Sequence, residues 1–254
     1  MRILLTNDDG IHARGLAVLE AIARALSDDI TIVAPLEEQS GKGRSLTLSE
    51  PLRLRRFGER RYAVRGTPTD AVMMALAEIM TDGPPDLILS GVNRGANVGE
   101  DVSYSGTVAA AMEGAHAGIR SIALSQRYDA DNAGDRVSFE AAEQWGERVL
   151  RPLLDAPLAP RSFVNVNFPP LPAADVKGVR IVAQGLRDYG RVRIERRDDP
   201  RGFPYYWLRL GRVPHVAQAD TDLDALELGY ITVTPLHLDL THRESLDMLA
   251  AAYR

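Results

Sequence analysis

Short apolar runs alternate with helical stripes along the first 150 residues of the chain. The runs, which are mostly aliphatic or β-branched, predict buried strands at 2–6, 30–34, 87–90 and 122–125. Apolar residues at helical spacing predict amphipathic helices at 16–26, 72–80 and 139–149, and a further helix is predicted from residue 106. This β-α-β-α rhythm predicts an α/β fold with a doubly wound, mainly parallel sheet.

One segment interrupts the rhythm. It predicts two strands, 46–54 and 61–64, around a turn at Gly58. The helix that follows has a recognisable start, because Thr67 can cap it, Pro68 suits its first turn and Asp70 suits its third position.

The pattern changes after residue 150. Proline-rich sequence surrounds predicted strands at 163–168, 179–183 and 230–234, and a helix is predicted at 243–253. The arms 189–196 and 203–210 predict a β-hairpin rich in arginine and aromatic residues, which suits either a solvated edge or a subunit-contact arm. We therefore divide the chain into a catalytic core, 1–150, and a part, 151–254, that completes the core and carries the hairpin and terminal helix within one structural unit.

Composition and charge exclude several classes of function. The 254 residues include 30 Lys and Arg against 35 Asp and Glu, and the net charge of −5 argues against a general binder of duplex nucleic acid or anionic membranes. The chain has no cysteine, which excludes disulfides, thiolate metal sites and cysteine nucleophiles. No signal-peptide pattern is present, and no apolar run approaches the ~20 residues of a membrane span. We expect a soluble, cytoplasmic protein.

Two adjacent carboxylates, Asp8 and Asp9, come directly after the first predicted strand. They suit either a helix cap or a cation site, because carboxylates are seldom buried at a strand end without a positive partner. The loops that hold Ser40 and Asn93 follow two other strands and open on the same edge of a parallel sheet. Together these loops offer carboxylate, hydroxyl and amide oxygens, which are typical ligands of Mg²⁺ or Mn²⁺.

The long loop after residue 90 leads into an alanine-rich helix. It contains Asn97 and ends at Ser105, Gly106 and Thr107. Serine and threonine at a helix start are ordinary caps, but small residues there also expose backbone N–H groups to an anion. The loop has neither the closing Gly-Lys-Ser/Thr of a Walker loop nor the spacing of a dinucleotide fingerprint.

Several separated motifs resemble one family. They occur in order as Asn-Asp-Asp-Gly-Ile at 7–11, Gln-Ser-Gly at 39–41, Gly-Thr-Pro-Thr-Asp at 66–70, Ser-Gly-Val-Asn at 90–93 and Tyr-Ser-Gly-Thr-Val at 104–108. The chain resembles the SurE family of survival-protein nucleotidases over nearly its full length. That resemblance implies a Rossmann-like core, a C-terminal oligomerisation arm and one divalent metal ion held by Asp8, Asp9, Ser40 and Asn93.

From the residues and the resemblance together we expect a phosphomonoesterase that hydrolyses nucleoside monophosphates. It would be a 5′-nucleotidase with a further 3′ activity left open. Asp8, Asp9 and Asn97 are the expected catalytic residues, with water activated by the metal as nucleophile ahead of direct attack by a carboxylate. The phosphate is expected on Asn97, Ser105, Gly106 and Thr107.

Two other functions remain open. One is a nucleotide-binding regulatory module without turnover, and the other is a sugar-nucleotide transferase, whose carboxylate pair usually follows a later strand. A homodimer or homotetramer is expected, with neither a nucleic-acid duplex nor a membrane as partner.

Overall fold

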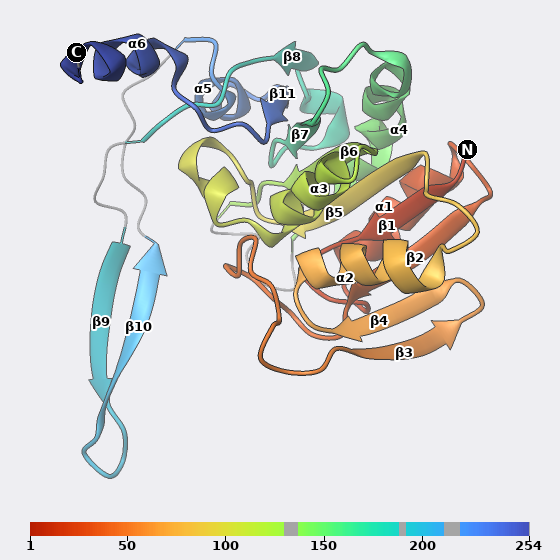
Figure 1. The fold of residues 1–254 in the computed structure, drawn as a ribbon, viewed down its shortest axis with the longest axis horizontal. Helices are drawn as coiled ribbons and strands as arrows, with labels where there is room; N and C mark the ends of the chain where they lie inside the picture. The colour runs from red at the N-terminus through yellow and green to blue at the C-terminus, as the bar shows by residue number, and fades with distance from the viewer. Residues whose placement is uncertain (130–136, 188–191, 211–218, 254) are drawn as a thin grey trace.

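The structure is a computed structural model that describes residues 1–129, 137–187, 192–210 and 219–253. The described residues form a nine-stranded sheet in the order β3-β4-β2-β1-β5-β6-β7-β11-β8 and a separate two-stranded hairpin, β9-β10 (Figure 1). The strands are β1 (Ile3–Thr6), β2 (Ile30–Pro35), β3 (Arg53–Gly58), β4 (Arg61–Arg65), β5 (Leu87–Arg94), β6 (Arg120–Gln126), β7 (Ser162–Phe168), β8 (Val179–Ile181), β9 (Val192–Asp198), β10 (Pro204–Leu210) and β11 (Ile231–His237).

The sheet is parallel from β4 to β7 and antiparallel at β3 and at the β7–β11 pair. The chain runs outward from β1 to β2 and later returns to β5 on the other side of β1. The point where the strand order reverses therefore lies between β1 and β5. Ligands of open α/β sheets bind at such a point, outside the carboxyl ends of the strands.

Helices cover both faces of the sheet, as the alternating pattern predicts. The α-helices are α1 (Arg14–Arg24), α2 (Pro68–Met74), α3 (Gly106–His116), α4 (Glu140–Asp155), α5 (Asp222–Glu227) and α6 (Arg243–Ala252). Single turns of other helix types occur at Ala75–Ile79, Gly99–Ser103 and Ala173–Asp175. Within the described ranges, no helix has both the length and the apolar character that crossing a membrane requires.

The core has two layers because successive side chains of a strand point to opposite faces. Ile3 and Leu5 of β1 face the layer beneath α1 and α4, whereas Leu4 faces the layer beneath α2 and α3. The predicted doubly wound, mainly parallel fold is confirmed. The predicted start of α2 is also confirmed, since Thr67 and Asp70 form a reciprocal capping box.

The predicted strand 46–54 is wrong for most of its length. Only residues from Arg53 onward are in β3, and residues 46–52 form no strand. Leu46 and Leu48 are 46% and 87% exposed, so their alternation with polar residues does not reflect a buried face. The predicted strand 179–183 is also shorter, because β8 ends at Ile181 and only an isolated bridge joins Ala183 to Thr221.

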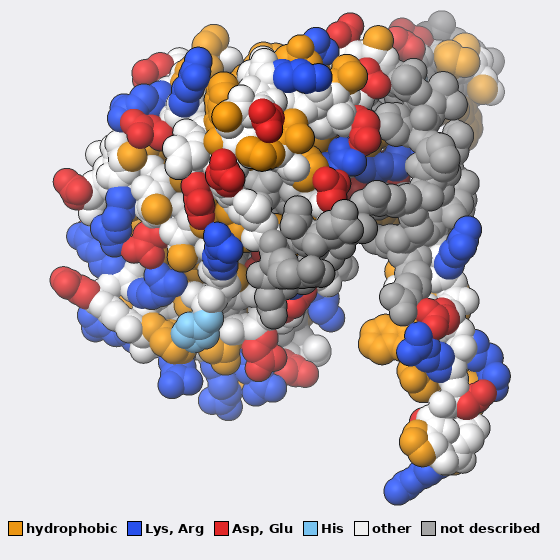
Figure 2. Space-filling model, turned by 180° about the vertical axis from the view of Figure 1, so that it is seen from behind, with side chains coloured by type: hydrophobic (Ala, Val, Ile, Leu, Met, Phe, Trp, Pro, Cys, Tyr) orange, Lys and Arg blue, Asp and Glu red, His pale blue; other side chains and the backbone are white. Residues whose placement is uncertain are grey.

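The hairpin β9-β10 extends away from the body of the molecule (Figure 1). The predicted hairpin at 189–210 is confirmed from Val192 to Leu210, while residues 189–191 lie outside the described ranges. Figure 2 shows hydrophobic and charged side chains exposed along this ribbon. The terminal helix α6 has no buried residue.

Candidate functional site

The predicted carboxylate pair lies at the point where the strand order reverses. A turn of Asn7 ends β1, because its Nδ2 donates to the Gly10 carbonyl (2.9 Å) and its Oδ1 accepts from the Gly10 amide (3.2 Å). Gly10 adopts φ +101°, a conformation that favours glycine. Asp8 and Asp9 are thereby left at the carboxyl end of β1, beside the ends of β2 and β5.

Asp8 is packed against the start of α3 and is only 4% exposed. The Thr107 hydroxyl donates a hydrogen bond to Asp8 Oδ1. A Cβ atom on Gly106 would lie 2.7 Å from Asp8 Cβ, so this close approach requires glycine. Burial raises the pKa of Asp8 to about 6, the Thr107 hydrogen bond opposes that rise, and the charge of Asp9 adds to it.

Asp9 is held from β5. Its Oδ2 accepts a hydrogen bond from the backbone amide of Arg94 (3.0 Å). Burial raises the pKa of Asp9, and the hydrogen bond and charge of Arg94 oppose that rise. Both carboxylates are thus placed where the negative charge is disfavoured unless a cation is present.

The loop predicted to begin after Ser90 begins later. β5 continues to Arg94, because pairing with β6 resumes at Asn93 and Ser125 after an irregularity that follows Ser90. Gly91 permits this irregularity, since it adopts φ +139° and a Cβ there would lie 2.2 Å from the Leu124 carbonyl oxygen. The extended strand carries Asn93 and Arg94 to the site.

The other two predicted metal ligands lie on neighbouring strand ends. The backbone N–H of Gln39 donates to the backbone carbonyl oxygen of Asp8 (2.8 Å), which brings the loop after β2 beside Asp8. In that loop Ser40 is exposed, and its hydroxyl donates to Glu38 Oε1 (2.8 Å). Asn93 Nδ2 donates to the backbone carbonyl oxygen of Gly95 (2.8 Å), just beyond the end of β5. The three strand ends therefore converge as predicted.

These residues fit a hard divalent cation. Among the described residues, no group of three or more His, Cys, Asp or Glu side chains could hold a metal ion. A cation here would take two carboxylates, Asp8 and Asp9, and would complete its shell from the Ser40 hydroxyl, the Asn93 amide and water. Mg²⁺ prefers oxygen ligands and commonly keeps several waters with one or two carboxylates.

Asn97 is fixed by β6 and β7 and is 7% exposed. Its Nδ2 donates to Ser125 Oγ (2.8 Å) and its backbone amide donates to Asn167 Oδ1 (2.8 Å). Its carbonyl oxygen accepts from Asn165 Nδ2 (2.7 Å) and Asn167 Nδ2 (3.2 Å). Four hydrogen bonds to two buried strands thus hold this loop residue in one position.

The start of α3 combines a cap with free backbone donors. Ser105 Oγ accepts a hydrogen bond from the Val108 amide (3.0 Å), so the capping interpretation of Ser105 is confirmed. The first intrahelical bond runs from Ala109 to the Ser105 carbonyl (3.0 Å). The amides of Gly106 and Thr107 precede it, and such amides at a helix start can bind an anion. Since the Thr107 hydroxyl donates to Asp8, a phosphate would meet the backbone amide of Thr107.

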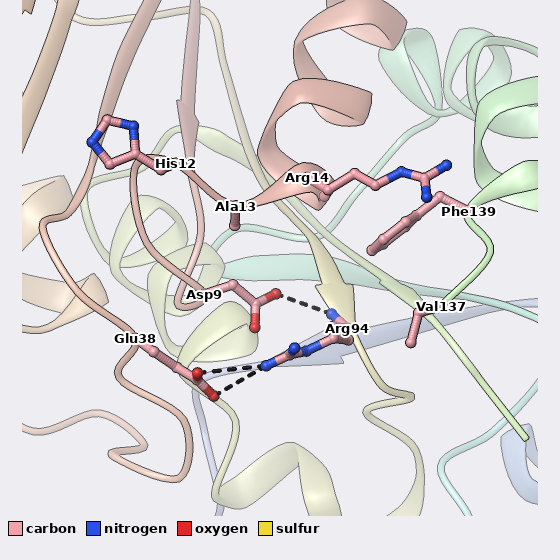
Figure 3. A pocket seen from close by; sticks show the side chains of 9 residues that line it. Asp9, His12, Ala13, Arg14, Glu38, Arg94, Val137 and Phe139 are labelled. Atoms are coloured by element: carbon pink, nitrogen blue, oxygen red, sulfur yellow. Dashed lines mark hydrogen bonds and ion pairs between the residues drawn. The ribbon is translucent and has the colours of Figure 1, made fainter. Parts of the chain in front are cut away.

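Sequence reasoning missed residues that hold the predicted ones in place. The Glu38 carboxylate accepts hydrogen bonds from the Ser40 hydroxyl and from Arg94 Nη2, the second at 3.4 Å. Figure 3 shows the contact between Glu38 and Arg94. Asn165 and Asn167 had a readable signal, because two asparagines alternate with valines on a short apolar strand. The hydrogen bond between Asp9 and the Arg94 amide had no signal in the sequence, because it joins residues that are 85 positions apart.

Comparisons with known proteins agree on one family. A family model described as "Survival protein SurE" matches residues 3–191. The chain is 68% identical to a protein of Rhizorhabdus wittichii and 56% identical to one of Erythrobacter litoralis, both named 5′-nucleotidase SurE and both matched over 100% of each chain. A solved structure, the SurE protein from Aquifex aeolicus, is similar with a TM-score of 0.84, 36% identity and 100% of both chains covered.

Proposed function

The chain belongs to the SurE family of survival proteins, and from this premise we propose that it is a nucleotidase that releases phosphate from nucleoside monophosphates. The reaction is the hydrolysis of a phosphomonoester, and curated relatives at 52–68% identity carry the name of that activity. The observation that carries the proposal is the pair of adjacent carboxylates at the end of β1, with Asp8 buried against the start of α3 and Asp9 half-buried and held by the Arg94 amide of β5.

We propose that Asp8, Asp9, Ser40 and Asn93 hold one divalent cation, Mg²⁺ or Mn²⁺. When bound, such an ion supplies positive charge that stabilises a phosphoryl group in transfer and lowers the pKa of water. Thr107 positions Asp8 through its hydroxyl, and the Arg94 amide positions Asp9.

The phosphate donors are proposed on the Asp8 side of the pair. The backbone amides of Gly106 and Thr107 lie at the start of α3, where the helix dipole favours negative charge. Ser105 directly precedes them, and Asn97 is proposed to complete the site from the loop after β5, where hydrogen bonds to β7 hold it. Because these donors are already fixed in the fold, they can stabilise charge without reorganising during the reaction.

A panel of substrates tests the function. We expect inorganic phosphate to be released from 5′-monophosphates in the presence of Mg²⁺ or Mn²⁺, and 3′-monophosphates in the same panel decide the regiochemistry. A nucleotide-binding module without turnover would bind the same compounds by calorimetry and release no phosphate. Transfer of a glycosyl group from a sugar nucleotide, with no monophosphate hydrolysis, would support the transferase instead.

Removing the hydroxyl of Thr107 is expected to lower turnover without unfolding the protein. Thr107→Val keeps the side-chain volume of this fully buried residue but removes the donor to Asp8. We expect kcat to fall roughly 10²-fold, the effect typical of losing one preorganised donor. Thr107→Ser keeps the hydroxyl and should retain most activity. Near-normal kcat in Thr107→Val, measured by phosphate release, would contradict the positioning role.

Ser105→Ala separates the capping role of this serine from its proposed phosphate role. Loss of a cap alone costs about 1 kcal/mol of unfolding free energy. We expect in addition a lower kcat and weaker inhibition by inorganic phosphate. Thr221→Ala is the matched control, since Thr221 caps α5 by accepting from the Asp224 amide (3.4 Å). If both variants lose stability and neither loses activity, Ser105 is only a cap.

We propose that the part 151–254 mediates a homodimer or homotetramer through the hairpin. Large apolar side chains are exposed on both faces of β10: Tyr205 and Trp207 at 41% and 52% on one, Tyr206 and Leu208 at 59% and 63% on the other. A hairpin packed on its own chain would bury one of these faces, whereas here both are exposed. Exposed apolar patches of this kind are typical of subunit contacts.

Light scattering tests the assembly. We expect intact protein at micromolar concentration to have two or four times the mass of one chain, and a variant lacking 189–210 to have a lower mass. Metal binding should survive the deletion, because Asp8, Asp9, Ser40 and Asn93 all lie in the first half of the chain. A monomeric mass for the intact protein would refute the proposal.

A further inference from the structure

A cavity of about 310 Å³ lies against Asp9, and no residue of α3 lines it. Its lining includes Asp9, Arg94 and Glu38 from the strand ends, and Arg14, Val137 and Phe139 from α1 and the segment before α4 (Figure 3). None of the proposed phosphate donors lines it. The proposed phosphate site and this cavity therefore meet at the carboxylate pair, with Asp8 facing the former and Asp9 the latter.

One wall of the cavity presents the Arg14 side chain, backed by apolar side chains that are almost fully buried. Val137 and Phe139 are 2% and 3% exposed. The guanidinium carbon of Arg14 lies 5.7 Å from the centroid of the Phe139 ring, and its Nη2 lies 3.7 Å from Glu143 Oε1. The Arg14 side chain remains 62% exposed, so the guanidinium has a face open to a second planar group. Arginine stacks on aromatic rings in this way.

The opposite wall is polar and of mixed charge. Arg94 Nη2 lies 3.4 and 3.5 Å from the two carboxylate oxygens of Glu38, and both side chains are partly exposed. Glu38 Oε1 also accepts from the Ser40 hydroxyl (2.8 Å). A carboxylate held in this manner keeps acceptor capacity for ligand hydroxyls, because its two oxygens offer about four lone-pair sites.

We propose that this cavity binds the nucleoside of the substrate, with the base on the Arg14 guanidinium and the sugar hydroxyls on Glu38. This inference rests on the proposed function and names the part of the substrate that the cavity takes. The volume is within the range of small-molecule sites, about 300–1,000 Å³. A planar base and a sugar with hydroxyl donors match one wall that presents a planar guanidinium and one wall that offers acceptors.

A second anionic group fits the cavity less well. Two carboxylates, Asp9 and Glu38, face the same space as the two guanidinium groups, so the charges of these four groups cancel. The Arg94 guanidinium is already shared with Glu38. Phosphate sites commonly use a cluster of cations, whereas the described lining of this cavity mixes cations with carboxylates.

The test measures two products separately. Binding of adenosine is measured by calorimetry in buffer with Mg²⁺, and adenosine and inorganic phosphate are each titrated as inhibitors of nucleotide hydrolysis. In Arg14→Ala we expect the Kd of adenosine to rise about tenfold, as loss of one stacking contact predicts. Inhibition by inorganic phosphate should change less than about twofold. Arg24→Ala at the other end of α1, where Arg24 pairs with Glu20, is the matched control and should leave both unchanged.

Arg14→Lys separates stacking from charge. Lysine keeps the positive charge but lacks the flat guanidinium, so adenosine binding should weaken almost as much as in Arg14→Ala. An anion in the cavity would instead bind Arg14→Lys normally, and pyrophosphate binding lost only in Arg14→Ala would overturn the proposal. Unchanged adenosine affinity in both variants would also overturn it.

Failure of the cavity assignment and failure of the proposed function give different results. If the protein binds adenosine through Arg14 but releases no phosphate, the cavity assignment stands and the nucleotidase proposal fails. If it hydrolyses nucleotides while both Arg14 variants bind adenosine normally, the cavity assignment fails and the nucleotidase proposal stands.

Discussion

Asp8→Asn is expected to lower kcat for nucleoside monophosphates by at least about 10³-fold while the melting temperature stays the same or rises. The activity falls because the substitution removes half of the charge proposed to hold the cation and replaces an oxygen that faces the start of α3. Stability is retained because Asp8 is buried and burial raises its pKa to about 6. Near pH 7 the carboxylate of a metal-free protein is therefore charged at a cost that asparagine avoids.

Phosphate release and thermal unfolding, measured on the same preparation, check this prediction. Asp155→Asn is the matched control, because Asp155 is an exposed carboxylate at the end of α4 and lies in none of the three loops of the site. Asp155→Asn should change neither quantity. If Asp8→Asn keeps wild-type turnover, Asp8 has no part in the mechanism. If Asp8→Asn instead loses several kcal/mol of unfolding free energy, the role of Asp8 is structural.

Chelation is expected to abolish activity completely and reversibly. The proposed ligands, Asp8, Asp9, Ser40 and Asn93, include only two charged groups, and the described residues contain no cluster of His or Cys ligands that would retain a metal against a chelator. After treatment with EDTA and removal of the chelator, Mg²⁺ or Mn²⁺ should restore phosphate release. A metal-stripped sample with full activity would show that the carboxylates act without a cation.

The sequence predicted the elements that depend on local patterns. Continuous apolar runs placed β1 and β2, which are buried on both faces, and helical periodicity placed α1 and α4, because in each case the apolar residues are near in sequence. The same rule failed at 46–52, where Leu46 and Leu48 alternate with polar residues and no neighbouring strand covers them. A pattern of apolar residues states which face could be buried, and tertiary structure decides whether it is.

The candidate site divides in a similar way. Asp8, Asp9, Ser105 and Thr107 were accessible from sequence because each lies in a motif at the end of a strand or the start of a helix. The groups that fix them were not, since the hydrogen bonds from Asn165 and Asn167 to Asn97 cross about 70 residues. The end of β5 also depended on a long-range factor, namely its renewed pairing with β6 beyond Gly91.

One measurement tests the central claim, that a cation on Asp8 and Asp9 makes this fold a nucleotidase. Metal-stripped protein is titrated with Mn²⁺ while phosphate release from a nucleoside monophosphate is recorded, for the wild type and for Asp9→Asn. We expect wild-type activity to rise from zero and to saturate with one tightly bound ion per chain, and we expect Asp9→Asn to show neither the binding nor the activity. Activity that is independent of Mn²⁺, or that saturates equally in Asp9→Asn, would contradict it.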